Sequence, residues 1–166
     1  MTNKWNFQKP TEEEIRTRDE LAKKLGISPV ICQLLVMRGI TTEEEVIKFF
    51  KPNIADLHDP FLMPDMDKAV KRLNKALGER EKILVYGDYD VDGTTAVSLV
   101  YKFLRPYTSL LDYYIPDRYD EGYGISYKGI DYAAENDVKL IISLDCGIKA
   151  IEKIEYAKTK GIDFII

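Results

Sequence analysis

Residues 82–93, which read KILVYGDYDVDG, decide the fold of this chain. The first five have the length and apolar content of a buried β-strand, and the strand stops at a glycine. Three aspartates follow at alternate positions before a second glycine and an apolar, helix-like stretch: Asp88, Asp90 and Asp92. A strand that leads into a helix in this way is typical of a strand–helix–strand unit. The stretch therefore predicts a parallel sheet with a cluster of acids at the end of one strand.

The rest of the second half continues the same alternation of strands and helices. We expect strands at 82–86, 111–115, 138–144 and 162–166, and helices at 94–104, 126–135 and 148–158. Continuous apolar strands that alternate with helices indicate a parallel sheet covered by helices. The predicted fold class is α/β, with a parallel sheet of about four strands.

The first half of the chain reads as helical. Capping residues and glycine or proline signals predict helices at 11–26, 28–38 and 42–50, then a proline-containing extended connector at 51–66 and a helix at 67–77. We expect two domains. An α-helical amino-terminal lead-in with its connector occupies residues 1–64, and the α/β domain occupies residues 65–166.

Composition limits the possible class of protein. The chain has 166 residues, 45% of them hydrophobic, which suits a packed globular protein. No apolar run approaches the roughly 18 residues of a membrane span. The first residues, MTNKW, lack the apolar core of a signal peptide. Neither Cys32 nor Cys146 belongs to a Cys-x-x-Cys pair, which argues against a disulfide scaffold or a zinc site. We therefore expect a cytoplasmic protein.

Charge is distributed unevenly along the chain. Residues 1–80 carry 14 basic and 13 acidic side chains, whereas residues 81–166 carry 10 and 15, so the net charges are +1 and −5. Such a balance does not predict a nucleic-acid-binding protein. It does not exclude one, because bound metal would offset part of the acidic excess locally.

A fourth acid follows the third predicted strand, in the sequence SLDCG at residues 143–147. The carboxyl ends of parallel strands meet at one edge of a sheet, where such folds place their binding sites. If the first and third strands are neighbours, Asp145 joins Asp88, Asp90 and Asp92 in one crevice. Clustered carboxylates raise each other's pKa unless a cation compensates them. The arrangement therefore predicts a site for a hard metal ion.

Other interpretations of the acidic loop fit less well. An EF-hand needs a preceding helix and a bidentate glutamate at its twelfth position, where this sequence has Leu99. A simple turn explains one or two acids but not four at two strand ends. A phosphate-binding P-loop requires a Gly-Lys-Ser/Thr ending that the sequence lacks. A receiver-like phosphorylation domain also gathers acids around magnesium, and this alternative stays open.

Several stretches resemble one known family. VYGDYDVDGTT at 85–95 resembles motif I of the DHH phosphoesterase superfamily in the form found in the RecJ single-strand DNA exonucleases. Further resemblances to RecJ are VMRGI at 36–40, FFKP at 49–52, DPFLMPDM at 59–66, IPDR at 115–118, EGYGIS at 121–126 and, for motif II, LDCG at 144–147. The resemblance covers nearly all of residues 28–166. It implies that residues 65–166 are the amino-terminal part of a DHH domain.

The resemblance also implies roles for individual residues. Asp90, Asp92 and Asp145 would be catalytic acids that bind manganese or magnesium, with two ions in the full-length enzyme and Asp145 between them. Asp88 would be a fourth metal ligand, or would only close the loop through backbone N–H groups. The residues implied to bind substrate are Gly93, Arg118, Tyr123 and Gly124.

The implied function is metal-dependent phosphodiester hydrolysis by a 5′-to-3′ exonuclease that is specific for single-stranded DNA and acts in DNA repair and recombination. A helicase or a single-strand-binding protein is the implied partner. The family's Asp-His-His motif is expected just past Ile166, and His58 is not that histidine. The resemblance thus implies an amino-terminal portion that has little activity alone. Two alternatives stay open: another DHH phosphoesterase acting on oligoribonucleotides, cyclic dinucleotides or polyphosphate, and a catalytically silent DHH-like scaffold.

Overall fold

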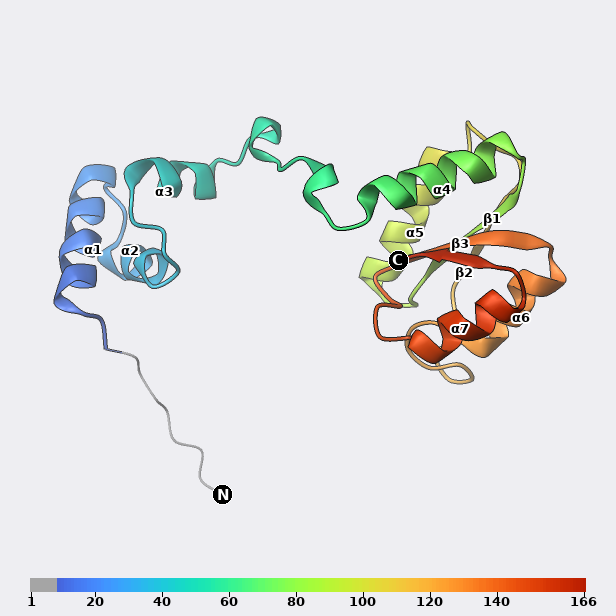
Figure 1. Ribbon diagram of the computed structural model, residues 1–166. Coiled ribbons are helices and arrows are strands. Elements are labelled where there is room, and N and C mark those ends of the chain that lie inside the picture. Colours follow the sequence, from blue (N-terminus) through green and yellow to red (C-terminus); the bar gives the residue numbers. More distant parts are fainter. Residues whose placement is uncertain (1–8) are drawn as a thin grey trace, which may run out of the picture. The chain divides into compact units, whose positions relative to one another are not determined.

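The computed structural model describes residues 9–166, and the chain divides into two compact units, residues 1–59 and 60–166 (Figure 1). The expectation that the amino terminus is not a signal peptide falls on residues that lie outside this described range. Within residues 9–166, no helix is both long enough and apolar enough to cross a membrane.

The described part of unit 1, residues 9–59, contains three α-helices: α1 (Glu12–Leu25), α2 (Pro29–Val36) and α3 (Glu43–Phe50). The sequence predicted all three from their ends. Thr11 and Thr42 each form a capping box with the glutamate three residues later, which satisfies the first free N–H groups of α1 and α3. Gly26 adopts the left-handed conformation that ends α1. The buried core is small and joins the helices through Leu21, Cys32, Leu35, Val36 and Val46.

The sequence predicted an extended connector, and this prediction is wrong. Two short 3-10 helices lie there, η1 (Ile54–Asp56) in unit 1 and η2 (Pro60–Leu62) in unit 2. Asn53 accepts a hydrogen bond from the N–H of Ala55, and Asp56 accepts one from the N–H of Asn53. This local capping satisfies the backbone without a sheet or a long helix.

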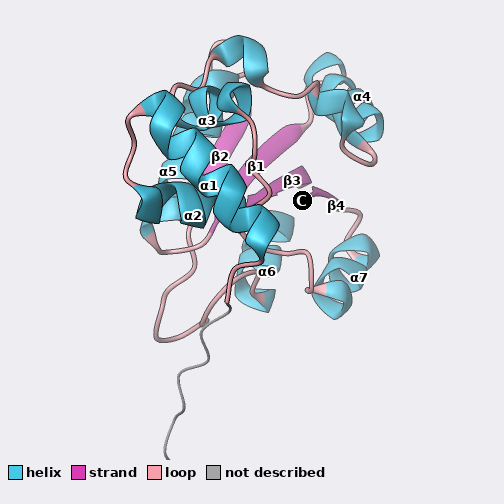
Figure 2. Ribbon diagram, turned by 90° about the vertical axis from the view of Figure 1, so that its left-hand side faces the viewer, coloured by secondary structure: helices cyan, strands magenta, loops and turns pink. Residues whose placement is uncertain are grey.

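Unit 2 is a parallel sheet flanked by helices, as the α/β prediction stated. Its elements are α4 (Met66–Gly78), β1 (Lys82–Gly87), α5 (Val91–Leu104), β2 (Leu111–Tyr114), α6 (Tyr127–Glu135), β3 (Val138–Leu144), α7 (Ile151–Thr159) and β4 (Asp163–Ile165). The four strands lie in the order β2-β1-β3-β4 and all pair in parallel (Figure 2).

Each face of the sheet has its own core. Helices α4 and α5 cover the face that presents Ile83 and Val85, while α6 and α7 cover the face that presents Leu84 and Tyr86 (Figure 1). Burying each such aliphatic side chain contributes about 1.5–3 kcal/mol relative to leaving it exposed. Ile83, Leu84 and Val85 are therefore consecutive apolar residues, because both faces of β1 are covered.

The strand order places a switch point beside β1. From β1 the chain passes through α5 to β2 on one side, and from β2 it returns through α6 to β3 on the other side. A crevice forms between the carboxyl ends of two such neighbouring strands, because their connections leave in opposite directions. The first and third strands are neighbours, the condition on which the shared crevice depended, since Lys82–Gly87 pairs with Val138–Leu144.

Two helix boundaries differ from the prediction. α5 begins at Val91, three residues earlier than expected, because Asp90 caps it through the N–H of Gly93. α7 begins at Ile151, later than expected, because the backbone is left-handed at Asp145 (φ 57°) and has a φ of 112° at Gly147. Gly93 therefore lies inside a helix, and Gly147 does not open one.

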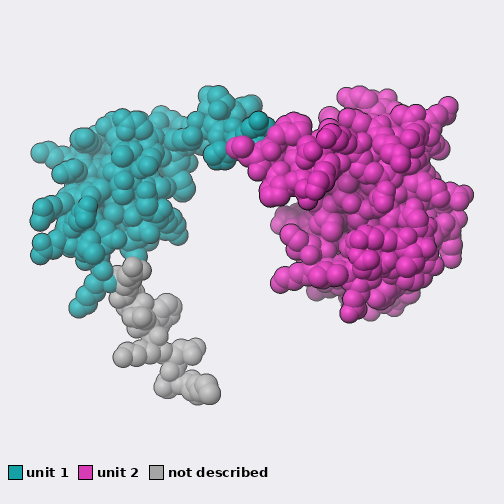
Figure 3. Space-filling model, viewed as in Figure 1, with its two compact units in different colours: residues 1–59 teal, residues 60–166 magenta. Residues whose placement is uncertain are grey.

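The two units meet in the chain at Asp59 and Pro60 (Figure 3). The domain division expected from the sequence, between residues 64 and 65, stays a prediction. With either boundary, the acids that follow β1 and β3 belong to the α/β unit.

Candidate functional site

Asp88 lies at the centre of the candidate site, directly after β1. Its side chain is fully buried, and Oδ1 accepts a hydrogen bond of 3.2 Å from the N–H of Gly124. Oδ2 is buried as well and has no hydrogen-bond partner. A buried carboxylate oxygen without a partner is costly, so its presence indicates a position that a cation would stabilise.

Two glycines bring α5 close to the end of β1. A Cβ on Gly93 would lie 2.4 Å from the carbonyl oxygen of Asp88 and 2.6 Å from its nitrogen. A Cβ on Gly87 would lie 2.3 Å from a methyl group of Val97. Neither position can hold a side chain without backbone movement. Gly93 therefore acts by allowing the first turn of α5 to lie against the backbone of Asp88.

The other two acids of the loop lie at the start of α5 and are exposed. Asp90 is the N-cap, and its Oδ1 accepts a hydrogen bond of 2.9 Å from the N–H of Gly93. Asp92 lies in the first turn, where a carboxylate is stabilised by the helix dipole. Both therefore have a structural role that the sequence-based interpretation did not assign to them.

Asp145 comes to this crevice from the end of β3. It is exposed, and its carbonyl oxygen accepts a hydrogen bond of 3.4 Å from the hydroxyl of Tyr123. The pKa of Tyr123 is raised, first by desolvation and then by the charges of Asp145, Asp88 and Asp90. The charges of acids that follow both β1 and β3 thus act on one phenol. Asp92 does not contribute to this shift.

Of the predicted substrate-binding residues, Arg118, Tyr123 and Gly124 occupy the loop between β2 and α6, whereas Gly93 lies in the first turn of α5. The rings of Tyr123 and Tyr89 meet edge to face at 6.1 Å, and the guanidinium of Arg118 lies 5.4 Å from the centre of the Tyr89 ring. Together the three residues form an aromatic and cationic layer beside the acids.

A pocket of about 410 Å³ opens beside this layer. Its lining includes Tyr123, Gly124 and Asp145, together with Lys149 and Lys153 from the region where α7 begins. Burial raises the pKa of the Cys146 thiol, also in the lining, to about 11, and the charges of Asp88 and Asp145 add to the shift. This thiol therefore stays protonated at neutral pH, which makes it a poor nucleophile.

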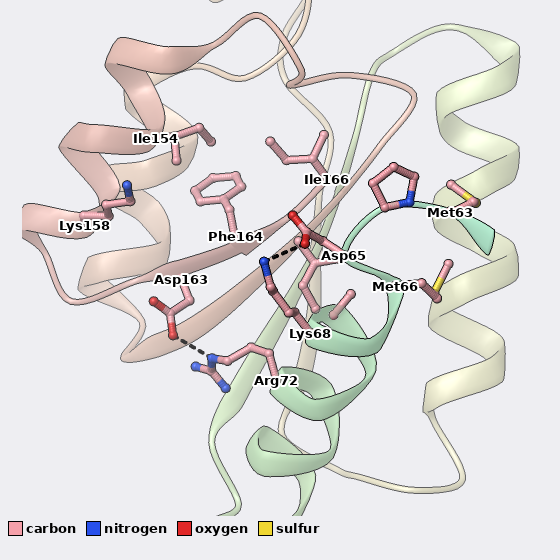
Figure 4. A pocket seen from close by; sticks show the side chains of 13 residues that line it. Met63, Asp65, Met66, Lys68, Arg72, Ile154, Lys158, Asp163, Phe164 and Ile166 are labelled. Atoms are coloured by element: carbon pink, nitrogen blue, oxygen red, sulfur yellow. Dashed lines mark hydrogen bonds and ion pairs between the residues drawn. The ribbon is translucent and has the colours of Figure 1, made fainter. Parts of the chain in front are cut away.

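A second pocket, of about 570 Å³, lies elsewhere in unit 2, between α4, α7 and β4 (Figure 4). Arg72 projects from α4 there and pairs with Asp163 at 2.6 Å and with Glu81 at 2.7 Å. Lys68 pairs with Asp65 at 2.6 Å. None of the four predicted metal-binding acids lines this pocket, so its larger volume does not make it the candidate site.

The sequence-based interpretation missed the residues that hold the glycine loop. Tyr86 is fully buried in β1, and burial raises its pKa to about 12, so its hydroxyl is neutral at physiological pH. This hydroxyl donates to the carbonyl oxygen of Gly124. Glu121 accepts hydrogen bonds from Tyr114 and from the N–H of Asp117. A carboxylate three residues before Gly124 was the only signal available, and one sequence did not distinguish it from a solvated charge.

The donor chemistry fits a hard divalent cation. All four acids supply carboxylate oxygens, which magnesium and manganese prefer, and Oδ2 of Asp88 lacks another partner. Among residues 9–166, however, no three histidine, cysteine or acidic side chains are gathered closely enough to hold a metal ion together. The described residues therefore do not form a closed set of metal ligands by themselves.

Comparison with characterised proteins yields relatives of one kind. The chain is 38% identical, over 163 residues, to the single-stranded-DNA-specific exonuclease RecJ of Bacillus subtilis, and the match covers 98% of this chain and 20% of that protein. It is 30% identical, over 141 residues, to RecJ of Escherichia coli, covering 84% and 24%. The chain thus spans only 20% of the length of the Bacillus subtilis protein and 24% of that of the Escherichia coli protein.

A solved structure has the same fold. The structure of RecJ in complex with Mn²⁺ from Thermus thermophilus superposes with a TM-score of 0.64 at 22% identity, over 93% of this chain and 20% of that one. The model of the DHH family's N-terminal domain matches residues 82–166. This match spans more than half of the chain, begins at β1, and contains the acids that follow both β1 and β3. The chain is a RecJ-like member of the DHH family.

Proposed function

We propose that this chain forms part of a metal-dependent phosphodiesterase that degrades single-stranded DNA from its 5′ end in the cytoplasm. The observation that carries the proposal is the buried, unpartnered Oδ2 of Asp88 at a switch point that also receives Asp145. The names of the relatives support the substrate, and the Mn²⁺ in the Thermus thermophilus structure supports the metal.

Asp88, Asp90, Asp92 and Asp145 would hold Mn²⁺ or Mg²⁺, two ions in the complete site. When bound, such ions stabilise negative charge on phosphoryl oxygens and make a water molecule more acidic. The chain's own residues position the substrate. Arg118 offers a cation for a phosphate, and Tyr123 offers a ring face on which a base can stack.

The proposal includes the organisation of the chain. Residues 1–64 would be a lead-in to a DHH domain that starts at residue 65. Because the described residues do not gather three metal-binding side chains, we expect the 166-residue chain alone to digest little single-stranded DNA. A helicase or a single-strand-binding protein is the proposed partner in repair and recombination.

The test compares two matched substitutions in the protein at its full natural length. Asp145→Asn and Asp137→Asn change exposed, left-handed aspartates at opposite ends of β3, with φ of 57° and 59°. Asparagine tolerates this conformation as well as aspartate does, so backbone strain is matched. We expect manganese-dependent digestion of 5′-labelled single-stranded DNA to fall to background in Asp145→Asn and to stay at the wild-type rate in Asp137→Asn.

The alternatives predict other results. Unchanged digestion by Asp145→Asn would contradict the assigned role of this acid. A wild-type protein that cleaves an oligoribonucleotide, a cyclic dinucleotide or polyphosphate in preference to single-stranded DNA would identify another DHH phosphoesterase. A wild-type protein that cleaves none of these substrates with Mn²⁺ or Mg²⁺ would identify a silent scaffold.

A further inference from the structure

One half-buried carboxylate organises the loop of residues 115–126, which joins β2 to α6. Both oxygens of Glu121 accept from the hydroxyl of Tyr114, at 3.0 and 2.9 Å. Glu121 also accepts from the N–H of Asp117 at 2.8 Å and from the hydroxyl of Ser126. The carboxylate thus links β2, the start of the loop and the N-cap of α6. Charge-assisted hydrogen bonds of this kind are stronger than neutral ones.

Tyr86 links the same loop to the central strand. Its hydroxyl accepts from the N–H of Ser126 at 3.0 Å and donates to the carbonyl oxygen of Gly124 at 3.0 Å. Its ring stacks on that of Tyr114 at 5.4 Å, and a Cβ on Gly129 would lie 2.6 Å from the Tyr86 ring. Position 129 of α6 must therefore be a glycine, because a side chain there would overlap the Tyr86 ring.

The network ends at the candidate metal site. Gly124 accepts a hydrogen bond from Tyr86 through its carbonyl oxygen, and its N–H donates to Oδ1 of Asp88. Gly124 is thus fixed at both of its backbone polar groups, and its N–H in turn fixes the Asp88 carboxylate. Oδ2 of the same carboxylate remains the buried atom without a partner.

We infer that Tyr86 and Glu121 are positioning residues for the metal site. They act through the backbone of Gly124, which orients the carboxylate of Asp88 so that Oδ2 is presented to a cation. The same network holds Tyr123, which precedes Gly124 in the loop. The inference rests on the proposed function, because it requires Asp88 to be a metal ligand.

A matched tyrosine separates positioning from general stability. The ring of Tyr132 packs 5.2 Å from that of Tyr114 in the same aromatic cluster, but its hydroxyl donates to Asp112 on β2. Tyr86→Phe and Tyr132→Phe each remove one hydrogen-bonded hydroxyl and keep the ring. Only the first change releases Gly124.

Direct binding of Mn²⁺ is the main measurement, made on the full-length protein by the loss of the electron paramagnetic resonance signal of free Mn²⁺. Removing an outer hydrogen-bond partner of a metal ligand weakens metal affinity about 10- to 100-fold. We expect a dissociation constant about tenfold or more above wild type for Tyr86→Phe, and the wild-type value for Tyr132→Phe. The manganese concentration for half-maximal DNA digestion should rise with it, while saturating manganese restores most of the rate.

Glu121→Gln is the second variant, because its amide keeps the shape but accepts fewer hydrogen bonds. It should weaken Mn²⁺ binding in the same direction, which keeps the inference testable if Tyr86→Phe does not fold. Equal loss of binding in Tyr132→Phe and Tyr86→Phe would overturn the inference and assign the effect to the stability of the cluster. Unchanged Mn²⁺ affinity in both Tyr86→Phe and Glu121→Gln would overturn it too, and leave the proposed function standing. A wild-type protein that neither binds Mn²⁺ nor digests DNA would refute the proposed function itself.

Discussion

Substitution of Gly93 by alanine tests how closely α5 must approach β1. The added Cβ would lie 2.4 Å from the carbonyl oxygen of Asp88, whereas ordinary van der Waals contact begins at 3.4 Å. The backbone must therefore open by about 1 Å, and overpacking of this kind typically costs about 1–3 kcal/mol. Alanine's higher helix propensity offsets at most about 1 kcal/mol. We expect the free energy of unfolding to fall by about 2 kcal/mol.

Urea denaturation of unit 2 measures this change. All 11 tyrosines lie in unit 2, so their near-ultraviolet circular dichroism reports on that unit. With a typical urea dependence of about 1–3 kcal/mol per molar, the midpoint should fall by about 1 M. Gly78→Ala is the control, since Gly78 is the last residue of α4 and its added Cβ would meet nothing within 4 Å. A Gly93→Ala variant with the wild-type midpoint would refute the claim that this approach is tight.

Two further predictions concern ionic contacts in unit 2. Arg72→Met should lower the free energy of unfolding by about 1–3 kcal/mol. The loss is smaller than for a fully buried pair, because Arg72 and Glu81 are 19% and 17% exposed. Arg72→Lys keeps the charge but loses the link to Asp163, so its urea midpoint should lie between those of Arg72→Met and wild type. The pKa of Asp131 is lowered, first by the hydroxyl of Tyr156 at 2.7 Å and then by Lys160. Its contribution to stability should therefore be complete above the ordinary aspartate pKa of about 3.9 and vanish as the pH falls through the lower folded value. The urea midpoint of wild type should exceed that of Asp131→Asn at pH 7, and a gap that does not narrow as the pH falls below about 3.9 would contradict this linkage.

Much of the fold was predictable because its signals are local. Thr11 and Thr42 indicate where helices begin, because each forms a capping box that involves only nearby residues. The apolar run of β1 predicts a strand that is covered on both faces, and this prediction does not require knowing which helices cover it. The pairing of β1 with β3 was only a condition of the sequence-based interpretation, because no local pattern encodes the order of strands in a sheet.

The parts that sequence reasoning missed are those where one side chain has two uses. Asp90 has the spacing of a metal ligand, and this spacing concealed its action as the N-cap of α5. Glu121 collects donors from β2, its own loop and the start of α6, and no fixed sequence spacing encodes partners that the fold brings together. In the sequence, Tyr86 resembles the apolar residues of a buried strand, because the hydrogen bonds of its hydroxyl to Gly124 and Ser126 depend on the fold.

A carboxylate has two oxygens, and this fold uses them differently. Oδ1 of Asp88 accepts from Gly124, and Oδ1 of Asp90 accepts from Gly93, so one oxygen of each acid fixes the side chain to the backbone. The second oxygen of each is then held in place before any cation binds, and the ordering entropy is lost on folding instead of on binding. The cost of this arrangement is the buried, unpartnered Oδ2 of Asp88, which destabilises the metal-free fold. In the proposed function a bound cation offsets this desolvation, which a simple turn after β1 would leave uncompensated.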